Sequence, residues 1–132
     1  MRAPWLIPKH SSHKLVTFVV LGDRDEAGIL ALAASLAFAA GHPLGAAICN
    51  RSDEPEINLQ YVDQYQMLAF NGVGGLINGH AVVLGNSMLF AKSGIAFGDL
   101  GDWGERLGQQ GQSVTFIAID GMVAGFFGTR CV

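Results

Sequence analysis

The apolar residues of this chain fall into short segments that glycine, asparagine and aspartate separate. Residues 14–21 are rich in β-branched and aromatic side chains, which predicts a strand. An alanine-rich segment then predicts a helix that Asp23 caps and that runs to residue 40, where Gly41 can end it. A proline is well suited to begin a second helix, Pro43–Cys49. The chain therefore begins with a strand and two helices.

The rest of the chain predicts strands that tight turns connect. Asn78-Gly79 and Asp120-Gly121 each lie between two apolar segments, and such pairs are typical of two-residue hairpin turns, where both positions need positive φ. Strands joined in this way pair antiparallel, so we expect an α+β fold in which helices flank an antiparallel sheet. The expected elements are strands 57–62, 66–70, 76–77, 80–84, 113–119 and 122–127, a glycine-rich loop 71–75, a helix 87–92 capped by Asn86 or Ser87, and a helix 99–109.

The composition fits a single globular domain. The chain has 132 residues, of which 50% are hydrophobic and 14% charged, and its formal net charge is −3. We expect a poorly ordered lead-in at residues 1–13 and one domain at 14–132. The eight lysines and arginines are scattered, so nucleic acid is not an expected partner. The longest apolar run, residues 27–40, is shorter than the roughly 20 residues of a membrane span, so we expect a soluble, cytoplasmic protein.

The common catalytic and metal-binding motifs are missing from the sequence. It contains no Gly-x-Ser-x-Gly nucleophile turn and no Gly-x4-Gly-Lys-Ser/Thr phosphate loop. His10 and His13 lie three residues apart, but no cysteine or carboxylate accompanies them locally. We therefore expect no catalytic residue and no metal site.

Three local features are candidates for ligand binding. His42 lies between two predicted helices, where its ring can stack on a flat ligand or donate a hydrogen bond. The glycines of residues 72–75 would let backbone N–H groups approach a ligand, and Gly85-Asn86 ends a strand before a helix. Each feature also has a purely structural interpretation: a helix-terminal histidine, a bulge or turn, and a helix cap.

Taken together and in order, these features resemble the nucleotide-binding domain of copper- and zinc-type P-type ATPases. That domain combines a Ser-Glu-His-Pro-Leu motif, a Gly-x-Gly turn, a valine-rich hairpin that ends in Leu-Gly-Asn, and a closing hairpin with Asp-Gly. The resemblance extends over about residues 14–127, and the order and spacing of the motifs make it specific. The matching motifs are His42-Pro43-Leu44, Asn71-Gly72-Val73-Gly74, Leu84-Gly85-Asn86 and Asp120-Gly121.

The resemblance implies a six-stranded antiparallel sheet with flanking helices, and ATP as the ligand. It places the adenine near the histidine, which would orient the nucleotide. The glycine turn would provide a close backbone surface, and the Gly-Asn pair would line the adenosine pocket. The positions that match this nucleotide site are His42, Gly72, Gly74, Gly75, Gly85 and Asn86.

The sequence departs from the family pattern at positions that bear on affinity. Ala40-Gly41 stands where the family has Ser-Glu, and Ala37 stands where a glutamate usually accepts a hydrogen bond from the adenine amino group. Such an acceptor contributes roughly 0.5–1.5 kcal/mol, and more if it is charged, so ATP affinity should fall about tenfold or more. The resemblance thus implies ATP binding that is weak or lost. The alternative is a structural or interaction protein that keeps the fold without the nucleotide.

The resemblance also bears on catalysis and on partners. In these pumps the phosphorylated aspartate lies in Asp-Lys-Thr-Gly just ahead of the first strand, whereas residues 1–13 contain no aspartate. We therefore expect this chain to bind nucleotide without hydrolysing it and without transporting metal. The apolar Phe126-Phe127 end predicts exposed apolar surface and hence self-association, and contact with other ATPase domains is the other expected interaction.

Overall fold

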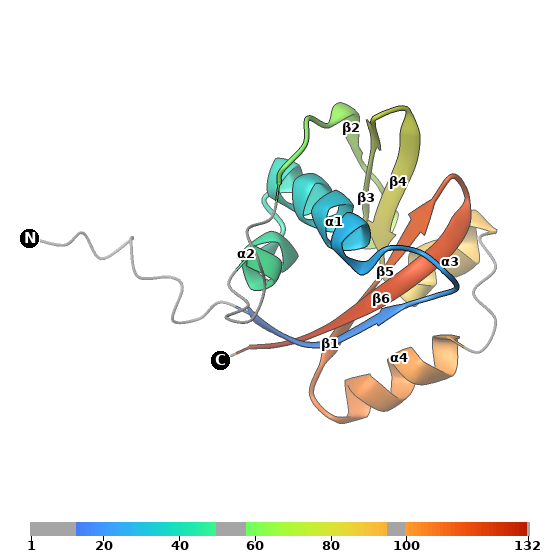
Figure 1. Ribbon diagram of the computed structural model, residues 1–132. Coiled ribbons are helices and arrows are strands. Elements are labelled where there is room, and N and C mark those ends of the chain that lie inside the picture. Colours follow the sequence, from blue (N-terminus) through green and yellow to red (C-terminus); the bar gives the residue numbers. More distant parts are fainter. Residues whose placement is uncertain (1–12, 50–57, 95–99, 132) are drawn as a thin grey trace, which may run out of the picture.

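The computed structural model describes residues 13–49, 58–94 and 100–131, which form a six-stranded sheet with helices (Figure 1). The strand order across the sheet is β1-β6-β5-β4-β3-β2. Every neighbouring pair is antiparallel, which confirms the fold class that the hairpin turns predict. The strands are β1 (His13–Val20), β2 (Asp63–Met67), β3 (Val73–Ile77), β4 (His80–Gly85), β5 (Ser113–Ile119) and β6 (Met122–Cys131).

Two pairs of helices pack against the sheet. α1 and α2 pack on each other, and they also contact the outer strands and β3 and β4. α3 contacts β4, and α4 contacts β5 (Figure 1). The boundaries of α2 agree with the predicted helix. The helices are α1 (Glu26–Ala40), α2 (Pro43–Cys49), α3 (Ser87–Ser93) and α4 (Leu100–Gln109), with a short 3-10 turn η3 (Ala69–Asn71).

Alternation along the central strands builds a separate core on each face of the sheet, because successive side chains point to opposite sides. In β5, Ile117 and Ile119 belong to the core formed with α1 and α2. Phe116 and Ala118 belong to the second core, formed with α3 and α4. The two helix pairs therefore cover opposite faces, and the central strands are apolar on both sides.

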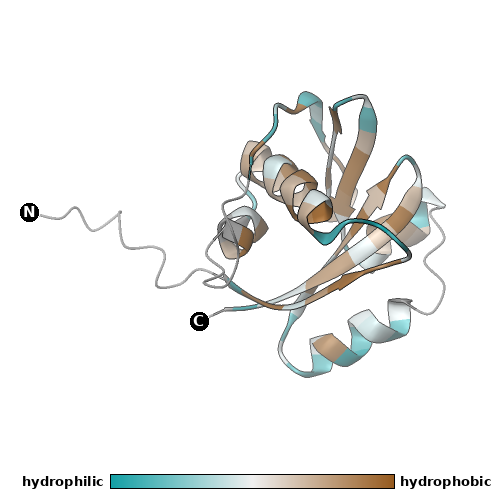
Figure 2. Cartoon of the chain, in the orientation of Figure 1, coloured by the Kyte–Doolittle hydropathy of each residue, from teal (hydrophilic) through white to brown (hydrophobic). Residues whose placement is uncertain are grey.

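The helices differ in how deeply they are buried. α1 is hydrophobic over most of its length, whereas α4 is mostly polar (Figure 2). Because α1 lies against both the sheet and α2, apolar residues suit most of its faces. Its cap is Asp25, whose side chain accepts the N–H of Gly28 at 3.1 Å. The prediction of Asp23 as the cap was wrong, since a turn at residues 22–23 precedes the helix.

The region from residue 58 to residue 75 differs from the prediction. No strand is present at residues 58–62, and β2 instead occupies Asp63–Met67, where it is an exposed edge strand. Edge strands tolerate polar residues because one row of their backbone groups and most of their side chains face water, and this removes the apolar signal used for the prediction. The predicted loop 71–75 was also wrong: the turn is η3, and residues 73–75 already belong to β3.

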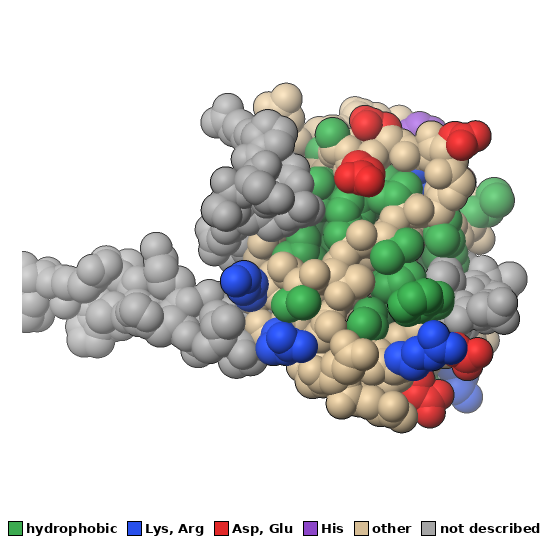
Figure 3. Space-filling model, turned by 60° about the horizontal axis from the view of Figure 1, so that its bottom comes forward, with side chains coloured by type: hydrophobic (Ala, Val, Ile, Leu, Met, Phe, Trp, Pro, Cys, Tyr) green, Lys and Arg blue, Asp and Glu red, His purple; other side chains and the backbone are tan. Residues whose placement is uncertain are grey.

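The C-terminal strand contradicts one expectation about the surface. Phe126 and Phe127 are 1% and 0% exposed, because β6 is an inner strand with a core on either side. This segment therefore offers no exposed apolar surface for self-association. Large apolar side chains are exposed elsewhere, including Val16 and Trp103. On the face drawn in Figure 3, hydrophobic side chains gather near the centre, with charged side chains of both signs around them.

Only the last position of the expected lead-in, residues 1–13, belongs to the described part of the chain. Residues 1–12 of the expected lead-in lie outside the described residues, and β1 begins at His13. Among the described residues, none of the helices combines the length and the apolar character needed to cross a membrane.

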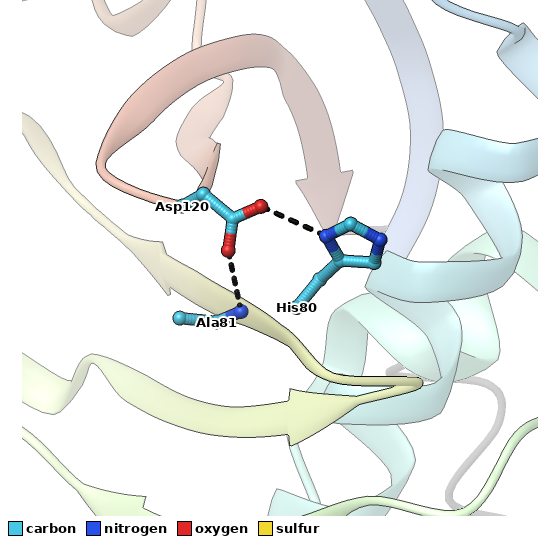
Figure 4. Close-up of polar contacts among 3 residues, drawn as sticks. All are labelled: His80, Ala81 and Asp120. Carbon is cyan, nitrogen blue, oxygen red and sulfur yellow. Dashed lines mark hydrogen bonds and ion pairs between the residues drawn. The ribbon is translucent and has the colours of Figure 1, made fainter.

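Both predicted hairpin turns are confirmed, and a polar contact joins them. Asn78-Gly79 and Asp120-Gly121 adopt positive φ at both positions. Asp120 also bonds across to the neighbouring hairpin: one carboxylate oxygen lies 2.8 Å from Nδ1 of His80, and the other accepts the N–H of Ala81 at 3.0 Å (Figure 4). These hydrogen bonds lower the pKa of the Asp120 carboxyl, since they stabilise its charged form.

The stability contributed by Asp120 should therefore depend on pH. Because its pKa is lower in the folded protein than in the unfolded chain, the carboxylate stabilises the fold above its ordinary pKa of about 4 and loses this effect as the pH falls through the lowered value. Urea denaturation of the parent and of Asp120→Asn measures this. We expect the difference in unfolding free energy to shrink below about pH 4. A difference that stays constant in strong acid would contradict the assignment.

Candidate functional site

A cleft of about 340 Å³ lies at the end of the sheet away from the two hairpin turns. The register explains its position: β4 ends at Gly85, β5 begins at Ser113, and Ser113 pairs with Thr129 near the end of β6. The turn before β3 and the junction between α1 and α2 complete the wall. The residues lining the cleft are His42, Leu44, Phe70, Asn71, Gly85, Asn86, Ser113, Val114, Thr115 and Thr129.

His42 is held at the cleft by hydrogen bonds at the junction of α1 and α2. Gly41 ends α1 in a left-handed conformation, and the N–H of His42 donates to the carbonyl of Ala37 at 2.8 Å, which is the Schellman pattern. Nδ1 of the His42 ring accepts the N–H of Leu44 at 3.0 Å, at the start of α2. With Nδ1 acting as the acceptor, the neutral ring carries its proton on Nε2 and can donate from there.

Gly85 and Asn86 also line the cleft, at the junction of β4 and α3. Asn86 is the N-cap of α3: its side-chain oxygen accepts the N–H of Leu89 at 2.9 Å. The structural interpretation of this residue as a helix cap is therefore confirmed, and it holds together with a position in the wall of the cleft. The Asn86 side chain is exposed, so its amide group remains in reach of a molecule in the cleft.

Gly72 lies beside this wall but is not among the lining residues. A Cβ at Gly72 would lie 2.3 Å from Cδ2 of Leu89, and a Cβ at Gly85 would lie at the same distance from the same atom. The buried Leu89 side chain thus occupies the space that both glycines leave open. At these two positions a larger residue would force the Leu89 side chain or the neighbouring segments to shift.

Gly74 and Gly75 lie in the body of β3 and away from the cleft lining. A Cβ at Gly74 would contact Leu68 at 3.3 Å, and one at Gly75 would lie 2.6 Å from Val62. The sequence predicts all four glycine positions in one ligand site, and the structure brings only Gly85 of these into the cleft with His42 and Asn86.

Several residues that line the cleft were not predicted as site residues from the sequence. Phe70 and Asn71 were assigned to the end of a strand and to a glycine loop, yet both adopt left-handed φ, at 57° and 62°. Little in the sequence indicates this left-handed turn, because asparagine adopts the conformation readily and phenylalanine does not. The hydroxyl-bearing residues of β5 and β6 line the wall because antiparallel pairing joins segments that are far apart in sequence.

Ala37 occupies a different environment from the cleft residues. Its side chain is 0% exposed and belongs to the core between α1 and the sheet. The side chain of a glutamate at this position would therefore leave the backbone inside the core. The gain in nucleotide affinity expected from Ala37→Glu stays a prediction.

The described residues of the cleft lining are polar, aromatic or aliphatic. Of the described residues that line it, none is an aspartate, glutamate, lysine or arginine. The wall combines amide, hydroxyl and imidazole groups with the aromatic ring of Phe70, so it suits a flat, uncharged group that forms hydrogen bonds. Within the described segments, no three His, Cys, Asp or Glu side chains are grouped to hold a metal ion.

Comparison with solved structures defines the class of fold. The N-domain of HMA6, a copper-transporting P-type ATPase, is covered completely by this chain with a TM-score of 0.65 and 20% identity, over 91% of the chain. A zinc-transporting PIB-type ATPase matches with a TM-score of 0.68 and 21% identity, over 92% of this chain and 19% of that one. The chain therefore has the fold of a P-type ATPase N-domain.

Sequence relatives specify the family further. A copper-exporting P-type ATPase of Legionella pneumophila is 35% identical over 109 residues, 83% of this chain, and a copper-transporting P-type ATPase of Rhizobium leguminosarum bv. viciae is 35% identical over 112 residues, 85% of this chain. No family model matches. The chain is thus homologous to heavy-metal P-type ATPases, which confirms the predicted resemblance. It spans 15% and 13% of the length of these two relatives.

The packing of Leu89 can be tested by a double-mutant cycle. Gly85→Ala should destabilise the fold by about 1–3 kcal/mol, because the new methyl group overlaps the Leu89 side chain. In a Leu89→Ala background, which removes the overlapping Cδ2 atom, the same change should cost less. Gly108→Ala is the control, since a Cβ there meets no atom within 4 Å and alanine favours the helix. Equal costs of Gly85→Ala in both backgrounds, measured by urea denaturation, would contradict this account.

Proposed function

We propose that this chain is an ATP-binding module of the heavy-metal P-type ATPase kind, and that it binds the nucleotide in the cleft at the end of the sheet. The observation that carries the proposal is the meeting of His42, Gly85 and Asn86 in one cleft. These residues come from separate parts of the chain, and all three were selected from the sequence as nucleotide contacts. A solved protein with the same fold supports it: the catalytic domain of the CPx-ATPase CopB-B, at a TM-score of 0.59 and 16% identity, changes conformation upon nucleotide binding.

The side chains of the cleft support a binding mode in which the adenosine part of ATP occupies the cleft. Nε2–H of His42 and the amide of Asn86 are donors that suit the nitrogen and oxygen acceptors of an adenosine. The hydroxyl groups of Ser113 and Thr115 add groups that both donate and accept. Because the lining carries no lysine or arginine among the described residues, the triphosphate would extend toward solvent.

The proposal concerns binding and leaves phosphoryl transfer to other parts of a full-length pump. We propose that the module works next to other ATPase domains in the cytoplasm, with apolar side chains such as Trp103, which is 48% exposed, available for those contacts. Affinity for ATP would be modest, since the cleft offers no carboxylate for the adenine amino group among the residues described there.

The first test is a titration of the labelled protein with ATP, followed by backbone amide shifts. Changes concentrated at residues 42–44, 70–71, 85–86 and 113–115 are expected. The absence of any change at millimolar ATP would overturn the proposal in favour of an interaction protein that keeps the fold without the nucleotide.

Substitution of His42 should separate its contribution to the start of helix α2 from its contribution to ATP binding. His42→Ala should weaken ATP binding about tenfold or more, since it removes the ring donor. His42→Asn keeps a side-chain acceptor for the N–H of Leu44, so it should retain helix α2 while still losing ATP affinity. His80→Ala removes an exposed histidine at the other end of the sheet and is the matched control. Calorimetry measures the affinities, and equal binding by the parent and His42→Asn would contradict the role of the ring.

Substitutions of Asn86 should likewise separate the stability of the fold from the affinity for ATP. Asn86→Asp keeps a good N-cap for α3, so the thermal unfolding midpoint should stay near that of the parent. The carboxylate replaces the amide donor with a group that only accepts hydrogen bonds, so ATP binding should weaken. Asn86→Ala should instead lower stability by about 1 kcal/mol. Unchanged ATP affinity in Asn86→Asp would remove Asn86 from the proposed site.

A further inference from the structure

Phe70 is an aromatic residue that belongs to neither of the two cores formed by the described residues. It lines the cleft with 44% of its surface exposed, whereas Phe90, Phe116, Phe126 and Phe127 are at most 1% exposed. A large part of its surface is therefore open to a molecule in the cleft. Exposed aromatic rings in a cleft are common sites for stacking on flat ligands.

The backbone holds Phe70 in a conformation that is unfavourable for phenylalanine. Its φ is 57°, in the left-handed region, where the side chain of an L-residue crowds its own backbone. Asn71 follows with φ 62°. The turn is closed by two backbone hydrogen bonds, from Leu68 N–H to the Gly72 carbonyl at 2.7 Å and from Gly72 N–H to the Ala69 carbonyl at 3.1 Å. Strain of this kind concentrates at functional sites when the surrounding structure enforces it.

We infer that Phe70 is the base-recognition residue of the cleft and stacks on the purine ring of the nucleotide. This inference rests on the proposed ATP-binding function and deepens it. The ring lines the cleft without filling it, since about 340 Å³ remains beside it, within the range of small-molecule pockets. Stacking also needs no charged partner, which fits a lining without aspartate, glutamate, lysine or arginine among the described residues.

The inference defines a class of ligand. Recognition through the base predicts that adenosine, AMP, ADP and ATP bind with similar affinity, because the phosphates lie toward solvent. It also predicts that inorganic tripolyphosphate, which lacks a base, does not compete. Pyrimidine nucleotides should bind more weakly than purine nucleotides, since the smaller ring offers less area for stacking.

Phe70→Gly gives the sharpest test, because binding should weaken while stability is kept or increased. Glycine adopts left-handed φ without strain, so the thermal unfolding midpoint should stay the same or rise. Loss of the ring should weaken ATP binding about tenfold or more. Phe70→Tyr keeps an aromatic face and should bind ATP as the parent does. Tyr65→Leu is the matched control, since Tyr65 is 40% exposed on the edge strand β2 and does not line the cleft.

The outcomes separate the inference from the function on which it rests. If the parent does not bind ATP in calorimetry, the proposed function is wrong. If the parent binds ATP and Phe70→Gly binds equally well, the function stands and Phe70 has no part in base recognition. If Phe70→Gly binds more tightly, Phe70 obstructs the cleft, and the inference is likewise overturned. Weaker binding by a variant that is as stable as the parent supports it.

Discussion

The register of the antiparallel sheet is the constraint on which the rest of this structure depends. The turns at Asn78-Gly79 and Asp120-Gly121 close two hairpins at one end of the sheet, where Asp120 bonds to His80 and Ala81. The ends of these strands that are not joined by the two turns then lie at the opposite end of the sheet. There the pairing leaves the ends of β4 and β6, the start of β5 and the turn before β3 next to one another. The cleft exists because these open ends cannot all be closed by tight turns.

The same interactions that form the helix ends also shape the cleft. His42 and Asn86 each use one side-chain atom to accept a backbone N–H at the start of a helix. That hydrogen bond fixes the orientation of each side chain in the wall of the cleft. Leu89, behind the wall, fixes the spacing of the two glycine-bearing segments. A site assembled in this way is ordered before any ligand arrives, which lowers the entropic cost of binding.

The parts of the fold that sequence could predict are those with local rules. The two-residue turns, the helix Pro43–Cys49 and the Asn86 cap follow from residue type within a few positions. β2 was misplaced because an exposed edge strand of sequence Asp-Gln-Tyr-Gln-Met carries no apolar alternation. The wall formed by Ser113, Thr115 and Thr129 depends on pairing between distant strands, which no local pattern predicts.

The glycine motif illustrates how a correct family resemblance leaves the surroundings of individual residues undetermined. Gly72, Gly74 and Gly75 were grouped as a ligand-binding turn because glycine lets backbone N–H groups approach a ligand closely. In the structure the left-handed turn is formed one step earlier, by Phe70 and Asn71, while the glycines provide room for Leu89, Leu68 and Val62. A residue type that tolerates a conformation does not show where that conformation occurs. Phe70, which holds a left-handed φ that glycine would adopt without strain, is therefore the residue of this turn on which the inference about base recognition is based.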